Sequence, residues 1–440
     1  MTAREVAISA LLKTAQSRGY SNIELDAAIK KFGLTGVERS FFTALFYGVI
    51  EKKITLDYIV SKLSSRDIGD IDIKVLTILE AGLYQLKFMD KVPESAAVNE
   101  SVKLCARFLA PKNSGAFVNA VLREYIRRGG NVSYPDEKKE PIKYLSVAYS
   151  VPEWMCALWK ESFGGECEAL LSALSVPPKM TLRANTLKNS ADELISALGE
   201  RGVNAHRTEY SPVGVKISGN MPKEIMDELD GAFFVQDEAS QIAVCALGAT
   251  PGDAVLDVCA CPGGKSFGAA MDMKNNGAVL SLDLHGNKLG LIEKTAAKLG
   301  ISIIKTGVSD AGAVHENIPT ADKIICDVPC SGLGVIAKKP DIRYKSPNDI
   351  KNLPSLQKKI LEASSSYLKD GGVLVYSTCT LNPAENEDVV NDFLSRHADF
   401  SPEPFSVGKL SSSGMITLTP NVYGTDGFFI AKLRRAGGKR

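Results

Sequence analysis

The feature that most constrains the fold is a series of short apolar runs in the second half of the chain, separated by helical periods. The runs read AVLDVCA, GAVLSLDL, SIIKTGV, KIICDV and GGVLVYS, and the separators include NKLGLIEKTAAKLG and PSLQKKILEASSSYLK. Apolar strands joined by helices are typical of a parallel sheet with both faces covered, which predicts a doubly wound α/β domain over residues 238–436. The last two runs, MITLTP and GFFIAKLRR, have no helix between them, so we expect an antiparallel hairpin at one sheet edge.

Residues 1–128 have a helical pattern instead. In IDIKVLTILEAGLYQLKFM, apolar residues recur at steps of three and four and mark one buried face, namely Val75, Leu76, Leu79, Leu83 and Leu86. The polar segment GGNVSYPDEKKEP at 129–141 carries glycine and proline and is interpreted as a linker. Residues 142–237 alternate strands and helices, and FFVQDEASQIAV is expected to change from strand to helix at about Asp237. This middle part is predicted to be a small α+β module.

Composition sets the broad class of protein. A length of 440 residues predicts two or three domains, and 45% hydrophobic with 23% charged residues is ordinary for a soluble protein. The net charge of +1 argues against a chain that is basic overall but allows a local basic groove. Nine scattered cysteines are no disulfide framework and favour a reducing, cytoplasmic location. The start, MTAREVAISALLK, does not have a signal-peptide pattern, and the absence of an apolar run of about 18 residues predicts no membrane span.

A glycine-containing loop and a series of acids follow the expected strands. In DVCACPGGKS, Gly263 and Gly264 let backbone N–H groups approach a ligand, but the loop matches neither GxGxxG nor a Walker A loop. Asp283, Asp310 and Asp327 follow three successive strands, so they are expected at one carboxyl edge of the sheet, where ligands bind. A ligand with a ribose, an adenine and little negative charge fits this row, which favours S-adenosylmethionine. The alternative is a tight turn followed by acids that only cap helices.

Two cysteines are expected at this same edge. Cys330 stands in CDVPCSGLG, and Cys379 stands in YSTCT, 49 residues later. That separation fits one crossover unit, so their strands are predicted to be neighbours and the two thiols to converge. A disulfide between them is geometrically possible, but the reducing compartment argues against it. No metal is expected, because Cys259, Cys261, Cys326 and Cys330 offer only CxC and CxxxC spacings.

Methylation of a pyrimidine at C5 is the chemistry that needs a thiol beside a methyl donor. Addition of a thiolate at C6 makes C5 enamine-like, so that C5 can attack the sulfonium methyl; loss of the C5 proton and elimination of the thiol then restore the ring. A free thiol has a pKa of about 8.5, so the site is expected to lower the pKa of the attacking cysteine. Asp327 can hydrogen-bond the cytosine edge. On chemistry alone, either Cys330 or Cys379 can be the nucleophile.

Four segments resemble the motifs of the RNA cytosine-C5 methyltransferases: DVCACPGGKS, SLDLHGNKLGLI, CDVPCSGLGVIAKKPDIRYK and YSTCTLNPAENE. LRANTLK and FFVQDEAS resemble segments that precede the catalytic core in that family, and the helical start, ending in SGAFVNAVLREYIRR, resembles a NusB-like RNA-binding domain. The combination is similar to the bacterial 16S ribosomal RNA methyltransferase B family over nearly the whole chain. It implies an all-α NusB-like domain at 1–128, a small α+β RNA-binding module at 142–237 and a Rossmann-like class I methyltransferase domain at 238–436.

The resemblance also implies roles for particular residues. Asp283 would bind the donor's ribose, Asp310 would lie at its adenine, and Asp327 would lie between donor and cytosine. Cys379 would attack C6, and Cys330 would assist release of the methylated base. The methionine part of the donor would be held by the loop Cys259, Ala260, Cys261, Pro262, Gly263, Gly264 and Lys265. This loop reads CACPGGK where CAAPGGK is common in the family, and TCT stands where TCS is common; neither change removes a needed group.

A basic segment just after the first cysteine motif is the candidate RNA contact. Basic side chains interleaved with an aromatic ring can hold phosphates and stack a base, although a solvated basic loop is the alternative. The candidates are Lys338, Lys339, Arg343 and Lys345, with Arg183 in LRANTLK extending the surface. The resemblance implies that a monomer methylates a cytidine of 16S ribosomal RNA, the RNA of the small subunit. The same chemistry on transfer RNA, or a non-catalytic NusB-like assembly factor, are the alternatives.

Overall fold

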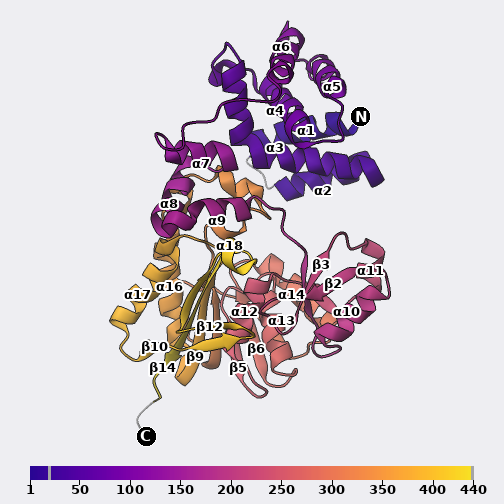
Figure 1. The fold of residues 1–440 in the computed structure, drawn as a ribbon. Helices are drawn as coiled ribbons and strands as arrows, with labels where there is room; N and C mark the ends of the chain where they lie inside the picture. Colours follow the sequence, from indigo (N-terminus) through magenta and orange to yellow (C-terminus); the bar gives the residue numbers. More distant parts are fainter. Residues whose placement is uncertain (18–20, 438–440) are drawn as a thin grey trace. The chain divides into compact units, whose positions relative to one another are not determined.

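A computed structural model describes residues 1–17 and 21–437 of the chain. Two compact units are present. The helical unit contains Met1–Ser175 together with Lys339–Lys345, and the sheet unit contains Val176–Lys338 together with Ser346–Arg440. Figure 1 shows the ribbon of both, coloured along the sequence. The expected boundaries differ from this division, because the contacts of residues 142–175 group them with the helices and not with the small module.

The helical unit is built around one apolar core, and its helical character confirms the expectation for residues 1–128. Its α-helices are α1 (Ala3–Ser17), α2 (Ser21–Phe32), α3 (Gly36–Leu63), α4 (Ile73–Phe88), α5 (Glu94–Arg107), α6 (Ser114–Arg127), α7 (Pro141–Tyr149), α8 (Glu153–Phe163) and α9 (Cys167–Leu174). The expected apolar face of α4 is buried in this core through Val75, Leu76, Leu79 and Leu83. Asp72 begins the helix by accepting hydrogen bonds from the backbone of Lys74 and Val75.

A short segment from late in the chain completes the helical unit. It contains the 3-10 helix η4 (Pro340–Tyr344). The Asp341 carboxylate accepts hydrogen bonds from the backbone N–H of Ser21 at 3.1 Å and from its hydroxyl at 2.6 Å. Tyr344 donates to the carbonyl of Ile50 at 2.5 Å, and the Trp154 ring N–H donates to the carbonyl of Lys345 at 3.1 Å. Residues that follow the first cysteine motif are therefore part of the helical unit's own structure.

The small module inside the sheet unit is a four-stranded antiparallel sheet in the order β2-β3-β1-β4. Its elements are β1 (Thr181–Ala184), α10 (Ala191–Gly199), β2 (Asn204–Arg207), β3 (Gly214–Ser218), α11 (Lys223–Glu228) and β4 (Phe233–Val235). Ser190 and Glu193 form a reciprocal capping box at the start of α10. The strand β4 leads into α12 (Glu238–Leu247), and Asp237 caps that helix, as the sequence predicted.

The large sheet has the order β10-β14-β9-β8-β5-β6-β7, with β13 paired to β14. Its strands are β5 (Ala254–Asp257), β6 (Ala278–Asp283), β7 (Ile304–Val308), β8 (Ala321–Asp327), β9 (Leu368–Thr378), β10 (Phe400–Pro402), β13 (Met415–Leu418) and β14 (Phe428–Arg435). Strands β5 to β9 are parallel, as predicted. The antiparallel pairing of β13 with β14 is confirmed, but the expectation that no helix separates them was wrong, because α18 (Pro420–Tyr423) lies between them. β14 is also an internal strand, because β9 pairs with one of its sides and β10 and β13 with the other.

Alternate residues of the central strands enter two separate cores. Val255, Ile325 and Val375 pack with α12, α13 (Gly264–Asp272) and α14 (Gly286–Leu299). Leu256 and Ile324 pack on the opposite face with α16 (Leu353–Ser366) and α17 (Glu387–Arg396). Figure 1 shows α16 and α17 on one side of these strands and α12 and α13 on the other. The remaining elements are α15 (Pro347–Ile350), β11 (Phe405–Val407), β12 (Leu410–Ser412) and α18 (Pro420–Tyr423).

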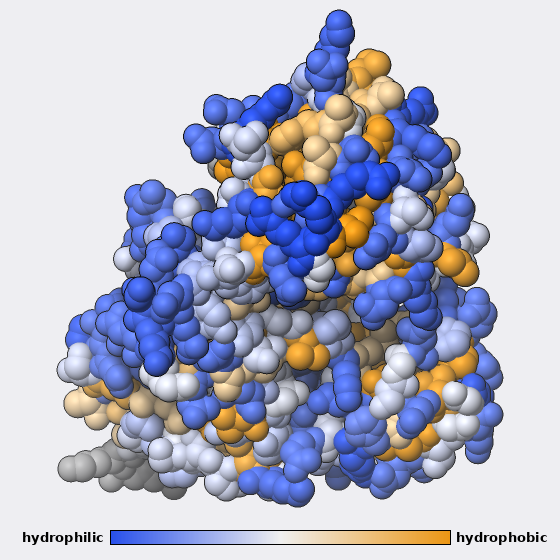
Figure 2. Space-filling model, turned by 45° about the horizontal axis from the view of Figure 1, so that its top comes forward, coloured by the Kyte–Doolittle hydropathy of each residue, from blue (hydrophilic) through white to orange (hydrophobic). Residues whose placement is uncertain are grey.

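The surface mixes hydrophilic and apolar residues. Figure 2 shows one such face, where hydrophilic side chains surround smaller apolar areas. Large exposed apolar side chains such as Val37, Leu109 and Val308 lie in separate parts of the chain. Scattered apolar residues of this kind are normal on protein surfaces. Among the helices of residues 1–17 and 21–437, none is both long and apolar enough to cross a membrane.

Candidate active site

Four carboxylates gather at the carboxyl ends of the parallel strands. Asp257 ends β5, Asp283 ends β6 and Asp327 ends β8, while Asp310 follows β7. The parallel register pairs these strands in the order β8-β5-β6-β7, so their ends form one edge. Asp283 and Asp327 are half-buried and Asp310 is exposed. The sheet therefore places the predicted acids where open α/β sheets bind ligands.

The loop after β5 is shaped by backbone hydrogen bonds and by Asp283. The N–H of Ala260 donates to the carbonyl of Leu282 at 2.8 Å, and the N–H of Cys261 donates to the Asp283 carboxylate at 3.2 Å. The second oxygen of Asp283 accepts from the backbone of His285 at 2.9 Å. Gly263 has a φ of 106°, and a Cβ there would collide with the Phe267 ring. Glycine at this position is therefore required by both backbone conformation and space.

Asp257 lies beneath this loop in a fully buried hydroxyl chain. The Ser266 hydroxyl donates to its carboxylate at 2.6 Å, and the Ser281 hydroxyl donates to Ser266 at 2.7 Å. Burial raises the pKa of Asp257 to about 7, although the hydrogen bond from Ser266 opposes the change. The sequence analysis gave this residue no role. Its signal was its place as the last residue of the first apolar run.

Both oxygens of the Asp327 carboxylate are engaged. The Lys265 ammonium lies 2.6 Å from Oδ2, and the Ser377 hydroxyl donates to Oδ1 at 2.6 Å. Lys265 comes from the start of α13, whereas Ser377 comes from β9, whose register pairs it with Asp327. The ammonium also lies 5.3 Å from the centroid of the Phe428 ring. These contacts fix the carboxylate's orientation at the edge where the cysteines emerge.

Cys330 and Cys379 meet at this edge, as the sequence predicted. Their Sγ atoms lie 3.1 Å apart, both cysteines are reduced, and both side chains are half-buried. The predicted adjacency of their strands is confirmed, because β8 and β9 pair directly. The backbone also ties the two turns together, since the N–H of Gly334 donates to the carbonyl of Cys379 at 3.0 Å. This spacing allows one sulfur to donate its proton to the other.

The pKa of the Cys330 thiol is raised well above its ordinary value. The largest cause is the hydrogen bond with Cys379, followed by burial and by the negative charge that Cys379 and Glu385 carry when ionised. The expectation of a lowered pKa concerned the attacking cysteine, which the resemblance makes Cys379, and it stays a prediction. Burial also raises the pKa of Cys261, to about 11, with Asp283 adding to the effect.

The sequence analysis missed the residues that support the two cysteine turns. Glu385 accepts hydrogen bonds from Ser331, and Asn386 bonds to the residues on either side of Cys379. Both lie in the quoted motif YSTCTLNPAENE, where two acids and two amides follow a strand end. Among residues 1–17 and 21–437, no group of three or more His, Cys, Asp or Glu side chains could hold a metal ion.

Three family models match this chain. Residues 244–434 match the 16S rRNA methyltransferase RsmB/F family, residues 1–127 match the NusB family, and residues 151–224 match the ferredoxin-like domain of RsmF/B-like methyltransferases. A Bacillus subtilis protein described as a probable ribosomal RNA small subunit methyltransferase B is 36% identical, and the match covers 99% of each chain. A Synechocystis protein with the same description is also 36% identical, over 99% of this chain and 100% of its own.

The chain belongs to the RsmB/F family of methyltransferases. Its architecture is a NusB domain, a ferredoxin-like module and a Rossmann-like methyltransferase domain. One solved structure superposes with a TM-score of 0.80 at 27% identity and covers 99% of both chains. A methyltransferase homolog from Pyrococcus horikoshii superposes with a TM-score of 0.59 at 28% identity, over 67% of this chain and 99% of its own. The expected fold class is thus confirmed.

The five predicted RNA contacts occupy very different environments in this RsmB/F family member. Arg183 is fully buried, and its guanidinium contacts Asp272 at 2.7 Å and the carbonyl of Gly268 at 3.2 Å. Arg343 is also buried. Neither side chain can reach RNA in this conformation, so both predictions are corrected: β1 is an internal strand, and η4 packs inside the helical unit.

The three lysines differ from one another. The Lys338 ammonium forms ion pairs with Asp237 at 2.8 Å and Asp426 at 2.5 Å within the sheet unit. Lys339 is exposed and Lys345 is half-buried, both in the helical unit. Lys339 is therefore the candidate most accessible to a phosphate.

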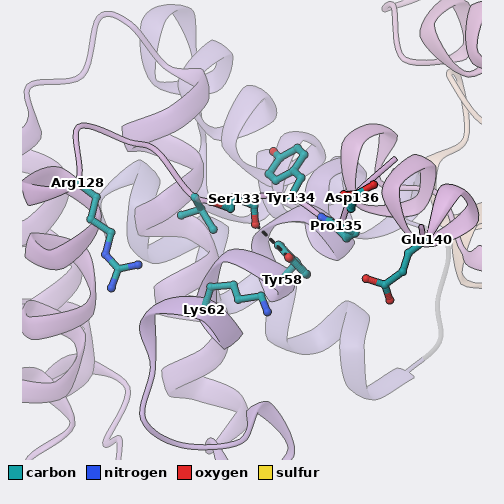
Figure 3. A pocket seen from close by; sticks show the side chains of 9 residues that line it. Tyr58, Lys62, Arg128, Ser133, Tyr134, Pro135, Asp136 and Glu140 are labelled. Carbon is teal, nitrogen blue, oxygen red and sulfur yellow. Dashed lines mark hydrogen bonds between the residues drawn. The ribbon is translucent and has the colours of Figure 1, made fainter. Parts of the chain in front are cut away.

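A cavity of about 380 Å³ lies in the helical unit, and none of the five predicted RNA contacts lines it. Figure 3 shows Tyr58, Tyr134, Lys62 and Arg128 around it, with the Tyr58 hydroxyl donating to the carbonyl of Ser133 at 3.1 Å. Asp136 and Glu140 also line it, so acidic and basic groups are mixed. This lining does not specify one ligand charge, and the cavity has no part in the function proposed below.

Proposed function

We propose that the chain transfers a methyl group from S-adenosylmethionine to C5 of a specific cytidine in 16S ribosomal RNA, through a covalent bond between Cys379 and C6. The observation that carries the proposal is the pair of thiols, 3.1 Å apart, at the sheet edge that also holds Asp283, Asp310 and Asp327. A methyltransferase that only transfers a methyl group to an already nucleophilic atom needs no thiol. Membership of the family supports the reaction class.

The residues at the strand ends fit S-adenosylmethionine by their charge. Carboxylates at the ends of β6 and β8 and after β7 suit ribose hydroxyls and a positively charged sulfonium, and Lys265 is already paired with Asp327. A pyrophosphate, which carries negative charge, would instead be repelled by these carboxylates. We assign the ribose to Asp283, the adenine side to Asp310 and the methionine part to the loop Cys259–Lys265. When bound, this cofactor supplies a methyl group that is electrophilic because it is attached to the sulfonium.

Asp327 and Cys379 act on the cytosine. A carboxylate accepts a hydrogen bond from the 4-amino group of cytosine, which selects cytosine over uracil, and Lys265 and Ser377 hold the Asp327 carboxylate in place for this contact. The Cys379 thiolate bonds to C6, and the electron pair of the C5–C6 bond makes C5 nucleophilic. C5 would then bond to the methyl carbon while the bond from that carbon to the donor's sulfur breaks, so that the sulfonium would leave as a neutral thioether. The target base must leave its stack before it can reach these sulfurs.

Cys330 is assigned to release of the methylated base. While Cys379 is a thiolate, Cys330 keeps its proton, because Cys379 is the largest cause of its raised pKa. Once Cys379 is bonded to C6, its sulfur carries no charge, and Cys330 can lose its proton to solvent. The Cys330 thiolate then removes the C5 proton, the bond between C6 and the Cys379 sulfur breaks, and the ring double bond re-forms. The pair returns to one thiol and one thiolate.

The substrate assignment rests on the relatives, which are described as acting on small-subunit ribosomal RNA, and on the NusB domain. Among the five candidates, we assign the contact with a phosphate to Lys339, which is exposed. We also infer that the protein acts in the cytoplasm as a monomer, with small-subunit ribosomal RNA as its partner and no membrane or metal involved.

The reaction is tested by incubating the protein and S-adenosylmethionine with unmethylated small-subunit ribosomal RNA and analysing the nucleosides by mass spectrometry. We expect 5-methylcytosine with the wild type and none with Cys379→Ala. Bisulfite sequencing of RNA from a deletion strain and its parent identifies the cytidine. Methylation of transfer RNA alone would show that the substrate assignment is wrong, and methylation of an exocyclic nitrogen would show that the chemistry is wrong.

A further inference from the structure

The Glu385 carboxylate is completely buried and accepts hydrogen bonds around the turn that carries Cys330. Its oxygens accept from the backbone N–H of Ser331 at 2.8 Å, from the Ser331 hydroxyl at 2.5 Å, and from the side-chain amides of Gln357 at 3.0 Å and Asn382 at 2.9 Å. The same Gln357 amide donates to the carbonyl of Pro329 at 2.9 Å. Glu385 therefore fixes the residue after Cys330 directly and the residue before it through Gln357.

Asn386 makes the equivalent contacts around the turn that carries Cys379. Its side-chain oxygen accepts from the Thr378 hydroxyl at 2.6 Å, and its side-chain amide donates to the carbonyl of Thr380 at 3.0 Å. Asn386 is also buried. The residues on both sides of Cys379 are thus bonded to one side chain. The hydroxyls of Ser331 and Thr380, 2.6 Å apart, also join the two turns.

We propose that the consecutive residues Glu385 and Asn386 are positioning residues with separate duties, Glu385 for the sulfur that releases the product and Asn386 for the sulfur that attacks. The inference rests on the proposed function, which gives the two sulfurs different steps. Each side chain acts by holding the backbone that flanks its cysteine. Reacting groups must be held within a fraction of an ångström to be productive, so a loosened turn should impair only the step of its own cysteine.

The residue types match these duties. Four N–H and O–H groups point at Glu385, and an ionised carboxylate only accepts, whereas a glutamine amide would place its own hydrogens against some of these donors. Asn386 must both accept and donate, and an aspartate would lose the donor to the Thr380 carbonyl. The exchanges Glu385→Gln and Asn386→Asp keep the shape of each side chain, so they test the hydrogen bonds and not the packing.

The test measures two quantities on the full-length protein with S-adenosylmethionine and 16S ribosomal RNA: methyl transfer, and the covalent protein–RNA complex that survives a denaturing gel. We expect Glu385→Gln to slow turnover and accumulate the complex, the outcome also expected for Cys330→Ala. Asn386→Asp should slow methyl transfer without accumulating it, the outcome also expected for Cys379→Ala. Glu387→Gln is the matched control, because Glu387 bonds to Thr417 and not to either turn. It should behave as the wild type.

A double variant separates positioning from a general loss of structure. If Glu385 acts through Cys330, Glu385→Gln in the Cys330→Ala background should trap as much complex as Cys330→Ala alone, because the step it supports is already lost. The inference is overturned if the double variant traps several-fold less complex, if Glu385→Gln alone traps none, or if Asn386→Asp traps it. If Cys330→Ala itself traps none, the proposed function fails and the inference fails with it.

Discussion

The two thiols at the sheet edge share one environment but differ in their supports. Their sulfurs are 3.1 Å apart. Glu385, however, accepts hydrogen bonds from the turn that carries Cys330, whereas Asn386 bonds to the turn that carries Cys379. The charge of one sulfur opposes ionisation of the other, so at most one thiolate is favoured at a time. This coupling provides a physical reason for two cysteines with sequential roles.

Asp327→Asn should lower the rate of methyl transfer far more than it weakens donor binding. The amide keeps the shape of the carboxylate but loses an acceptor for the cytosine amino group, and it no longer pairs with Lys265. The expected loss in kcat is of the order of a hundredfold, the lower range for a positioned polar group. Single-turnover kinetics and donor titration by calorimetry measure the two effects. A variant with normal kcat would remove Asp327 from the reaction.

Asp257 should make the stability of the sheet unit depend on pH. Burial raises its folded pKa to about 7, whereas an unfolded aspartate has a pKa of about 3.9. The folded state therefore holds the proton more tightly, and this contribution is complete below pH ~4 and lost as the pH rises to ~7. The wild type should lose up to about 1.4 kcal/mol per pH unit in this window relative to Asp257→Asn. Denaturant titrations at several pH values test this; equal slopes would contradict it.

The cysteines and the row of acids could be predicted from sequence because parallel strands expose their carboxyl ends at one edge. Residue position within a strand is enough for that inference. The contacts of Glu385 and Asn386 could not be predicted, because they depend on how two turns fold back on a third segment. The role of Arg183 was mispredicted for a related reason. Basic residues are usually exposed, but β1 lies inside its sheet and Asp272 neutralises the guanidinium.

At the scale of elements, the 3-10 turn η3 (Leu333–Val335) links the cysteine edge to the start of β14. The N–H of Gly334 donates to the Cys379 carbonyl at 3.0 Å, and the carbonyl of Gly334 accepts from the N–H of Gly427 at 2.9 Å. A Cβ on Gly334 would overlap the Gly427 carbonyl. Two glycines thus allow two backbones to approach within hydrogen-bond distance, where any side chain would separate them.

Gly334→Ala should therefore lower both stability and methyl transfer, because the turn must move away from Cys379. We expect a loss of about 1–3 kcal/mol in the free energy of unfolding, typical of overpacking. Gly290→Ala is the control, since an added Cβ in the middle of α14 meets no neighbour within 4 Å and should be neutral or slightly stabilising. Thermal unfolding with parallel activity measurements distinguishes the two variants. An active, stable Gly334→Ala protein would show that the approach is not required.

The elements themselves were largely predictable, because apolar periodicity follows burial. The five parallel strands and the hairpin were expected at the observed places. The internal position of β14 was not expected, since no sequence signal marks β10. This short strand pairs with β14 although it ends 26 positions before β14 begins. The segment Lys339–Lys345 resembled a basic loop, but the packing of Ile342 and Arg343 into the helical unit is a tertiary effect.

At the scale of the whole molecule, recognition of RNA depends on which basic residues are accessible. The net charge of +1 gives no overall attraction to RNA, so local cations must supply it. Buried and ion-paired basic residues contribute to folding instead. Arg183 and Lys339 represent the two cases, one fully buried and one exposed.

Arg183→Ala and Lys339→Ala should affect different properties, the first the stability of the fold and the second the binding of RNA. Arg183→Ala leaves Asp272 without its cation and should cost about 3–5 kcal/mol of stability, as expected for one partner of a buried pair. Lys339→Ala should leave stability unchanged, weaken RNA binding and reduce the dependence of log Kd on log salt by about one unit. Denaturant titration and RNA binding at several salt concentrations measure both. A stable Arg183→Ala protein with weakened RNA binding would reverse the assignment.

The assignment of the two thiols is the central claim, and trapping of the covalent complex tests it most directly. Cys330→Ala and Cys379→Ala are each incubated with S-adenosylmethionine and 16S ribosomal RNA, separated on a denaturing gel, and the linked peptide is identified by mass spectrometry. We expect a stable complex for Cys330→Ala, linked through Cys379, and none for Cys379→Ala. A complex that forms with Cys379→Ala and is linked through Cys330 would contradict it and exchange the two roles.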